Sequence, residues 1–102
     1  MDQNIYQMIL DFLHITQEPD ESSARRIQNE INSGMTFIKT YCDNDATCQP
    51  GTESGALLCE YVLRAESGAV ATFEADFAQD IVQMQVATDV RKYLEAIEDD
   101  PE

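Results

Sequence analysis

Few residues of this chain belong to the types that do chemistry, and their spacing does not match a metal or nucleophile site. Three cysteines stand at Cys42, Cys48 and Cys59, and His14 is the only histidine. A tetrahedral zinc site usually takes its four nitrogen or sulfur ligands from two closely spaced pairs. Because that spacing is missing and His14 is remote in sequence, we predict no metal, no cofactor and no Cys-His nucleophile.

The thiols have simpler structural interpretations. Cys59 falls on an apolar helix face, where we expect it to be buried like a small hydrophobic residue. Cys42 and Cys48 flank a polar loop and either stay reduced or oxidise to each other. An odd number of cysteines, with no basic-then-apolar leader at the N-terminus, predicts a reducing compartment and synthesis in the cytosol.

The carboxylates are numerous, but they form no catalytic motif. Glu74 and Asp76 stand two residues apart, which places them on different faces of a helix. Asp43 and Asp45 resemble the start of a calcium loop, yet no glutamate follows at the twelfth position, so we interpret residues 43–52 as a solvated loop. With no phosphate loop, Ser-His-Asp set or H-E-x-x-H motif, the chain is predicted not to be an enzyme.

Charge restricts the possible partners. The chain of 102 residues has 20 acidic and 6 basic side chains, a formal net charge of -14, with the excess concentrated in residues 53–102. Such a chain is repelled by DNA and by anionic membrane surfaces, so direct nucleic-acid binding is not expected and basic proteins are the natural partners. No apolar run approaches the ~20 residues that a membrane span requires. The acidity is equally well explained as a device for solubility alone.

The apolar pattern indicates helices throughout. Apolar residues recur every three or four positions in residues 4–13, in 20–41, from Thr52 or Ser54 to Gly68, and across 69–98, and no segment alternates with a period of two. The predicted fold is therefore an all-α bundle of four to five helices with short loops, formed as one domain by residues 1–98. The acidic end, residues 99–102, is expected to be disordered.

Some local features leave alternatives open. The candidate N-caps are Asp2 or Asn4, and Asp20, and a further helix is expected to start near Thr52 or Ser54. Gly34 lies on or beside an apolar stripe, where it either permits a close helix crossing or is merely tolerated. Residues 69–98 form one helix or two, because Val86, Ala87 and Thr88 have mixed helix propensity.

One segment is more specific than the rest. A helix containing Leu57, Leu58 and Tyr61 ends at Ser67-Gly68, and a short helix follows with the run from Ala69 to Phe77. This arrangement resembles the head-tail connector (adaptor) proteins of tailed bacteriophages, where Leu-Leu-x-x-Tyr precedes a small-residue turn and Ala-Leu/Val-x-x-Phe-Glu-x-x-Phe/Tyr follows. The resemblance covers most of residues 5–94. The chain departs from it at Gly68, where asparagine is common, and in its cysteine-containing loop.

The resemblance implies a structural virion protein of a phage or prophage. Similar proteins act after DNA packaging: they form a ring of about a dozen subunits under the portal protein and join the head to the tail with tail-completion proteins. The expected locations are the host cytoplasm during assembly and then the virion. By the same analogy the C-terminal region reaches the portal, which makes Tyr93, Leu94 and Ile97 candidate contact residues. Burial in the core is the alternative for them, and the stronger expectation for Leu94.

Two other functions remain open. A net charge of -14 is also typical of a small DNA-mimic inhibitor that occupies a basic groove of a nuclease or repressor. Such an inhibitor would act as a monomer or dimer, and DNA would compete for its target. A plain helical regulatory module is the third possibility, and nothing in the sequence favours it specifically.

Overall fold

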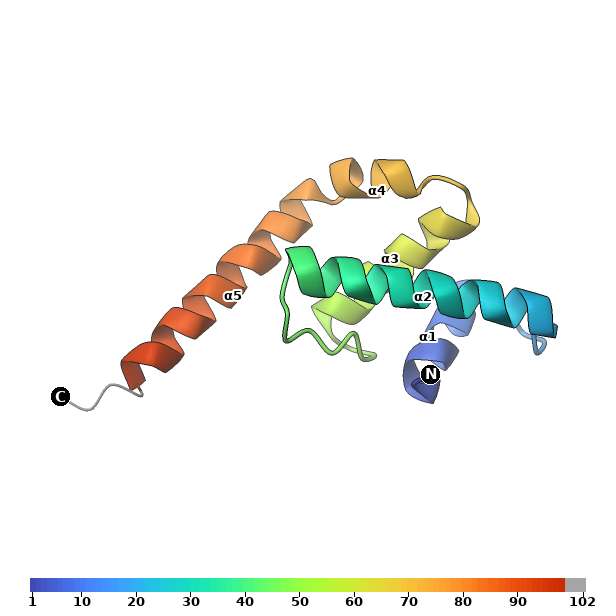
Figure 1. The fold of residues 1–102 in the computed structure, drawn as a ribbon, viewed down its shortest axis with the longest axis horizontal. Helices are drawn as coiled ribbons and strands as arrows, with labels where there is room; N and C mark the ends of the chain where they lie inside the picture. The colour runs from blue at the N-terminus through green and yellow to red at the C-terminus, as the bar shows by residue number, and fades with distance from the viewer. Residues whose placement is uncertain (99–102) are drawn as a thin grey trace.

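Within residues 1–98 the chain folds into five helices, which confirms the predicted small all-α bundle (Figure 1). The computed structural model describes residues 1–98, and the segment predicted to be a disordered acidic tail, residues 99–102, lies outside the described residues. Among the described residues, no helix combines the length and the apolarity needed to cross a membrane. The helices are α1 (Gln3–Phe12), α2 (Glu21–Tyr41), α3 (Glu53–Glu66), α4 (Val70–Asp76) and α5 (Ala78–Glu98).

Three helices begin at side-chain caps, and the sequence predicts two of these caps, Asp2 and Asp20. The Asp2 carboxylate accepts hydrogen bonds from the backbone N–H groups of Asn4 and Ile5, which decides between Asp2 and Asn4 as the first cap. Asp20 and Thr52 accept in the same way from backbone N–H groups three residues further on. A capping side chain satisfies donors that the first turn leaves free, so these residues fix where α1, α2 and α3 begin.

The centre of the molecule is the crossing of α2 and α3. On α2, Ile27, Ile31 and Ile38 are fully buried, and so are Leu58 and Val62 on α3. Burying one such side chain stabilises the fold by about 1.5–3 kcal/mol, so this seam contributes a large part of the stability. Helices α1 and α4 also pack against α3, which makes α3 the element that holds the bundle together.

Two glycines lie where a side chain has no room. Gly34 is buried in α2, and a Cβ at this position would stand 2.7 Å from a methyl group of Leu58 and 2.8 Å from the ring of Tyr61. This favours the interpretation of Gly34 as a residue that permits a close helix crossing. A Cβ on Gly55 would overlap the backbone carbonyl oxygen of Gln49, because the loop folds back onto the first turn of α3.

Residues 69–98 form two helices, and the interruption is at Phe77 rather than near residues 86–88, which run unbroken within α5. At this corner the Phe73 ring meets Tyr61 edge-on, with centroids 5.2 Å apart, and stacks on Phe77, also at 5.2 Å. Phe73 is almost completely buried. Aromatic packing, rather than the local propensity of residues 86–88, accompanies the change of direction.

Helix α5 extends away from the bundle, so that the molecule measures 58 × 28 × 18 Å along its principal axes (Figure 1). Its first half is anchored, since Ile81 and Met84 are buried. Val90, Leu94 and Ile97 lie on the opposite side of the helix, and they are exposed. Helix α5 therefore has some apolar side chains that are buried in the core and others that are exposed.

Replacing Gly55 by alanine is expected to lower the free energy of unfolding by about 2–3 kcal/mol, because the new Cβ meets backbone that cannot turn aside. Gly34→Ala is the matched control. Its Cβ meets only side chains, and alanine regains about 1 kcal/mol of helix propensity, so a loss of at most about 1 kcal/mol is expected. Urea denaturation measures both variants. An equal loss, or a larger one for Gly34→Ala, would contradict the close packing of the loop on α3.

Candidate protein-interaction surface

A row of large apolar side chains runs along the side of α5 that the rest of the described chain leaves open. Four of them, at positions 86, 90, 93 and 97, are separated by four, three and four residues, the spacing of a coiled-coil seam. Exposed apolar rows of this kind are typical of protein interaction sites. We call this surface the outer face of α5. It consists of Val82, Val86, Val90, Tyr93, Leu94 and Ile97.

The three predicted contact residues all lie on the outer face of α5. Tyr93 is 66% exposed, and Leu94 and Ile97 are each 52% exposed. Burial in the core, the stronger expectation for Leu94, is therefore wrong. The reason is that these residues lie on the side of α5 opposite the buried Ile81 and Met84, and no described element covers that side.

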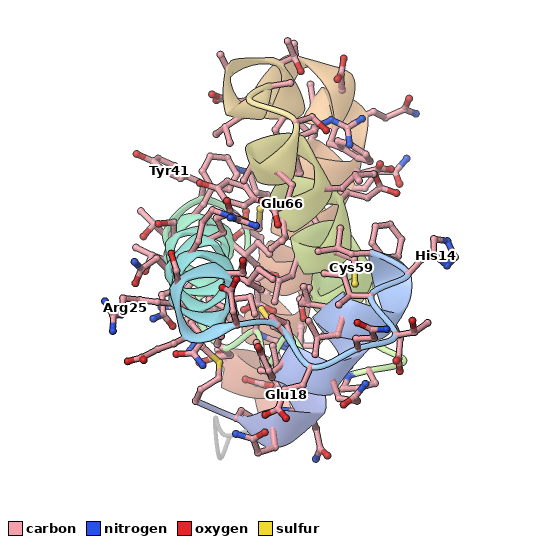
Figure 2. All side chains as sticks on the ribbon, turned by 90° about the vertical axis from the view of Figure 1, so that its right-hand side faces the viewer. His14, Glu18, Arg25, Tyr41, Cys59 and Glu66 are labelled. Carbon is pink, nitrogen blue, oxygen red and sulfur yellow. The ribbon has the colours of Figure 1, made fainter. Side chains whose placement is uncertain are left out.

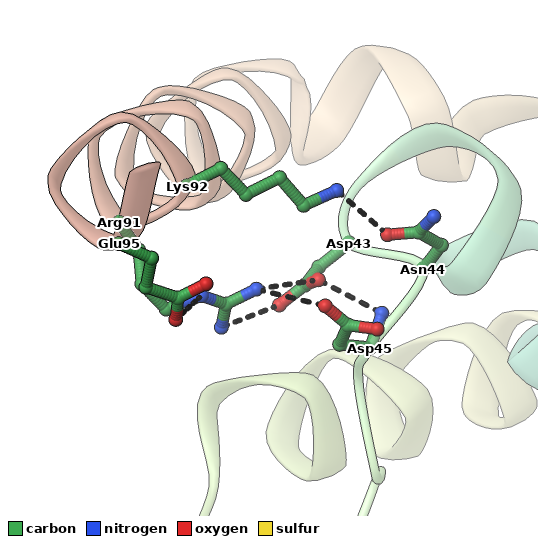
Figure 3. A network of polar contacts seen from close by, with 6 residues as sticks. All are labelled: Asp43, Asn44, Asp45, Arg91, Lys92 and Glu95. Atoms are coloured by element: carbon green, nitrogen blue, oxygen red, sulfur yellow. Dashed lines mark hydrogen bonds and ion pairs between the residues drawn. The ribbon is translucent and has the colours of Figure 1, made fainter. Parts of the chain in front are cut away.

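A cluster of polar side chains attaches the opposite side of α5 to the loop after α2 (Figure 3). The Arg91 guanidinium donates hydrogen bonds to Asp43, at 3.3 and 3.4 Å, and to Asp45, at 3.3 Å. Lys92 Nζ donates to Asn44 Oδ1 at 2.9 Å. We call these five residues the α5 clamp. Because the clamp uses Arg91 and Lys92, it turns the basic charge of α5 inward and leaves the outer face apolar.

Asp43 is the most tightly held acid of the α5 clamp. Partial burial acts to raise the pKa of its carboxyl group, but the backbone N–H of Asp45 and the Arg91 guanidinium outweigh that effect and hold the pKa below its usual range. Asp43 is therefore ionised at neutral pH, which the pairing with Arg91 requires. The sequence predicts a solvated loop at residues 43–52. That prediction is wrong for Asp43, which is bound to α5 through Arg91.

The clamp could not be found from the sequence. Asp43 and Arg91 are 48 positions apart, and opposite charges at such a distance form no local pattern. The sequence marks the paired acids Asp43 and Asp45, but the interpretation of residues 43–52 as a solvated loop gave these acids no partner. Among residues 1–98, no group of three or more His, Cys, Asp or Glu side chains is arranged to hold a metal ion.

The thiols and the histidine do not form a reactive pair. Cys42, Cys48 and Cys59 are buried and unbonded, as predicted for Cys59, and burial raises the pKa of each thiol. A raised pKa disfavours the thiolate that a nucleophile or metal ligand needs. His14 is exposed and projects from the turn after α1, while Cys59 is a buried residue of α3 (Figure 2). We therefore regard the thiols as packing groups.

Glu30 is a weak point in the packing of α2 on α3. Its Oε2 atom is buried and accepts no hydrogen bond within the described chain. Burial and the negative charge of Glu66 raise the pKa of Glu30 to about 7, and Arg26 opposes them. The Arg26 guanidinium is itself occupied by Glu66, with two hydrogen bonds of 3.1 Å. The charged form of Glu30 is therefore poorly compensated.

Comparison with known proteins finds no matching family model, no significantly similar curated protein and no significantly similar solved structure. A functional interpretation therefore depends on the resemblance seen in the sequence and on the surfaces described above.

Glu30→Gln is expected to stabilise the protein by about 1 kcal/mol at pH 8 and to have little effect at pH 5. The folded-state pKa of about 7 exceeds the ordinary value of 4.5, so stability falls as the pH rises between these two values. Glutamine abolishes that loss. Thermal or urea denaturation at both pH values measures it, with the exposed Glu74→Gln as control. A stabilisation that is the same at pH 5 and pH 8 would contradict the assignment.

Arg91→Ala is expected to release the second half of α5 while lowering the global free energy of unfolding by only about 1 kcal/mol, because the ion pairs are partly exposed. Amide hydrogen exchange at pH 7 should then rise in residues 86–97 and stay unchanged in α2 and α3. Arg25→Ala is the matched control, since Arg25 pairs only with Glu21 within α2. Unchanged exchange in α5 would show that the α5 clamp does not hold the helix.

Proposed function

We propose that the protein is a structural subunit of a phage head-tail connector, which assembles into a ring under the portal protein and joins the head to the tail. In this function it has no catalytic role and no cofactor. Its partners are further copies of itself, the portal protein and tail-completion proteins. The resemblance of residues 56–77 to connector proteins supports the phage assignment, and the order of the helices agrees with it.

The observation that carries the proposal is the outer face of α5. Large apolar side chains on a helix that extends from the bundle are poorly explained as part of the protein's own core. Tyr93 provides the kind of aromatic anchor that often dominates the energy of a protein interface. Contacts between neighbouring subunits of a ring are heterologous, which means that they join two different surfaces. The outer face of α5 would therefore contact a different surface on its partner, and not the same face of a second subunit.

The acidity of the chain also supports this function. A ring around a DNA channel must let the DNA pass, and a net charge of -14 per subunit disfavours adhesion to phosphates. Basic side chains are few, and every arginine is already in an ion pair within the described chain. The surface is thus suited to lining a passage rather than to gripping nucleic acid.

Tyr93→Asp is expected to weaken binding to the portal protein of the same phage genome by about thirtyfold or more, the effect of losing a hot spot of ~2 kcal/mol. Leu63→Asp, which places the same charge at another partly exposed position, is the control. Binding is measured by biolayer interferometry with the full-length chain, and helical circular dichroism shows whether each variant is folded. Rings should be visible by negative-stain electron microscopy when the unmodified chain is mixed with the portal.

Two results would overturn the proposal. One is the absence of binding between the unmodified chain and the portal. The other is binding that Tyr93→Asp and Leu63→Asp weaken equally, since the outer face of α5 would then not be the contact.

The net charge of -14 favours a second candidate, a DNA-mimic inhibitor of a basic protein. That function predicts binding to a nuclease or repressor that added duplex DNA abolishes. It offers no explanation for the outer face of α5, whose side chains carry no charge. We therefore place it second.

A further inference from the structure

A second surface, distinct from the outer face of α5, is a groove between α3 and α5. It has a volume of about 560 Å³, in the range of ordinary ligand sites. Its floor includes Leu57 and Met84, which are buried, and its walls carry the small exposed residues Ala56 and Ala87. The small walls leave the apolar floor within reach of a side chain from outside. We call this surface the α3–α5 groove.

The rim of the α3–α5 groove is acidic. Glu53 and Glu60 border it on α3, and Asp80 borders it on α5, while no basic side chain lines it. Glu60 is neutralised by Arg64, with Nη1 and Oε2 2.9 Å apart. Glu53 and Asp80 are exposed, and neither forms an ion pair within residues 1–98. Two uncompensated negative charges therefore face whatever enters the groove.

The shape of the groove suits a helix. On α3 the lining residues at positions 53, 56 and 60, and on α5 those at 80, 84 and 87, recur every three or four residues along about two turns of each helix. Two helical walls of this length form a channel into which the side-chain ridge of a third helix can pack. Apolar side chains of that helix would meet the floor, and basic ones beside them would meet the rim.

A second copy of the chain is a poor occupant. Each copy has a net charge of -14, and all four arginines are already paired with acids of the same chain. The rim charges would therefore meet further negative charge. From this charge complementarity we infer that the α3–α5 groove binds an amphipathic helix of a different protein, with apolar side chains flanked by lysine or arginine.

The test uses a short fluorescent peptide of leucine and lysine, with its leucines on one helical face. Ala56→Trp fills the groove from an exposed position and is expected to weaken binding at least about tenfold. Ala96→Trp, at an exposed position on α5 outside the groove, is the control and should leave the affinity unchanged. Fluorescence anisotropy measures affinity, and circular dichroism checks the fold of each variant.

Charge is tested by a second pair of variants. Glu53→Gln with Asp80→Asn is expected to weaken peptide binding several-fold, and more strongly at low salt. Glu74→Gln with Asp89→Asn makes the same change in net charge at exposed sites outside the groove and should have a smaller effect.

Several results would overturn the inference. These are no peptide binding, binding that Ala56→Trp leaves unchanged, equal losses for the two acid pairs, or equal binding of a scrambled peptide without an apolar face. A dimer in native mass spectrometry that Ala56→Trp abolishes would identify a second copy as the occupant instead. Tyr93→Asp should not affect the peptide, so failure of this inference is distinguishable from failure of the connector function.

Discussion

The placement of α5 depends on Arg91. Apart from the buried side chains of its first half and a hydrogen bond from the Gln85 amide to the Tyr41 carbonyl, α5 is attached to the bundle through the contacts of Arg91 and Lys92 with the loop after α2. Single exposed ion pairs contribute little in water, but here one guanidinium meets two carboxylates that the loop itself presents. Because α5 forms one wall of the α3–α5 groove and carries the outer face, both surfaces take their geometry from this attachment.

Helix α3 gives the bundle its other fixed reference. One side of it packs against α2, where Leu58 and Tyr61 approach Gly34 closely, and the opposite side, with Ala56 and Glu60, forms a wall of the α3–α5 groove. The absence of a side chain at Gly34 leaves room for Leu58 and Tyr61 at this crossing. Because α3 packs in the core on one side and lines the groove on the other, its position in the core also sets the position of the groove wall.

The parts of the fold that could be predicted are those that depend on neighbours in sequence. Helical periodicity and caps such as Asp2 and Asp20 involve residues within about one turn of each other. The sequence pattern therefore predicted four to five helices and left open whether residues 69–98 form one helix or two. The division at Phe77 could not be placed, because it goes with the ring contacts that Phe73 makes with Tyr61 and with Phe77. Local propensity pointed instead to a stretch inside α5.

Periodicity also cannot tell whether an apolar side chain is covered. In α5, Met84 is buried, and Val86, two residues further on and therefore on the opposite side of the helix, is more than half exposed. Which side is covered depends on where the other helices lie, which no local window contains. For the same reason the three candidate contact residues were found only through the resemblance, and the α3–α5 groove was not found at all.

The second half of α5, beyond the buried Met84, has the properties of a lever. The helix rises about 1.5 Å per residue, so a bend of about 5° beside Met84 carries the end of α5, about 20 Å away, through about 2 Å. Added salt weakens the restraint at Arg91, and acid does so by protonating Asp43, while neither affects the apolar packing of Ile81 and Met84. The direction in which the far end of α5 points is therefore adjustable by the ionic conditions, even though its pivot stays fixed.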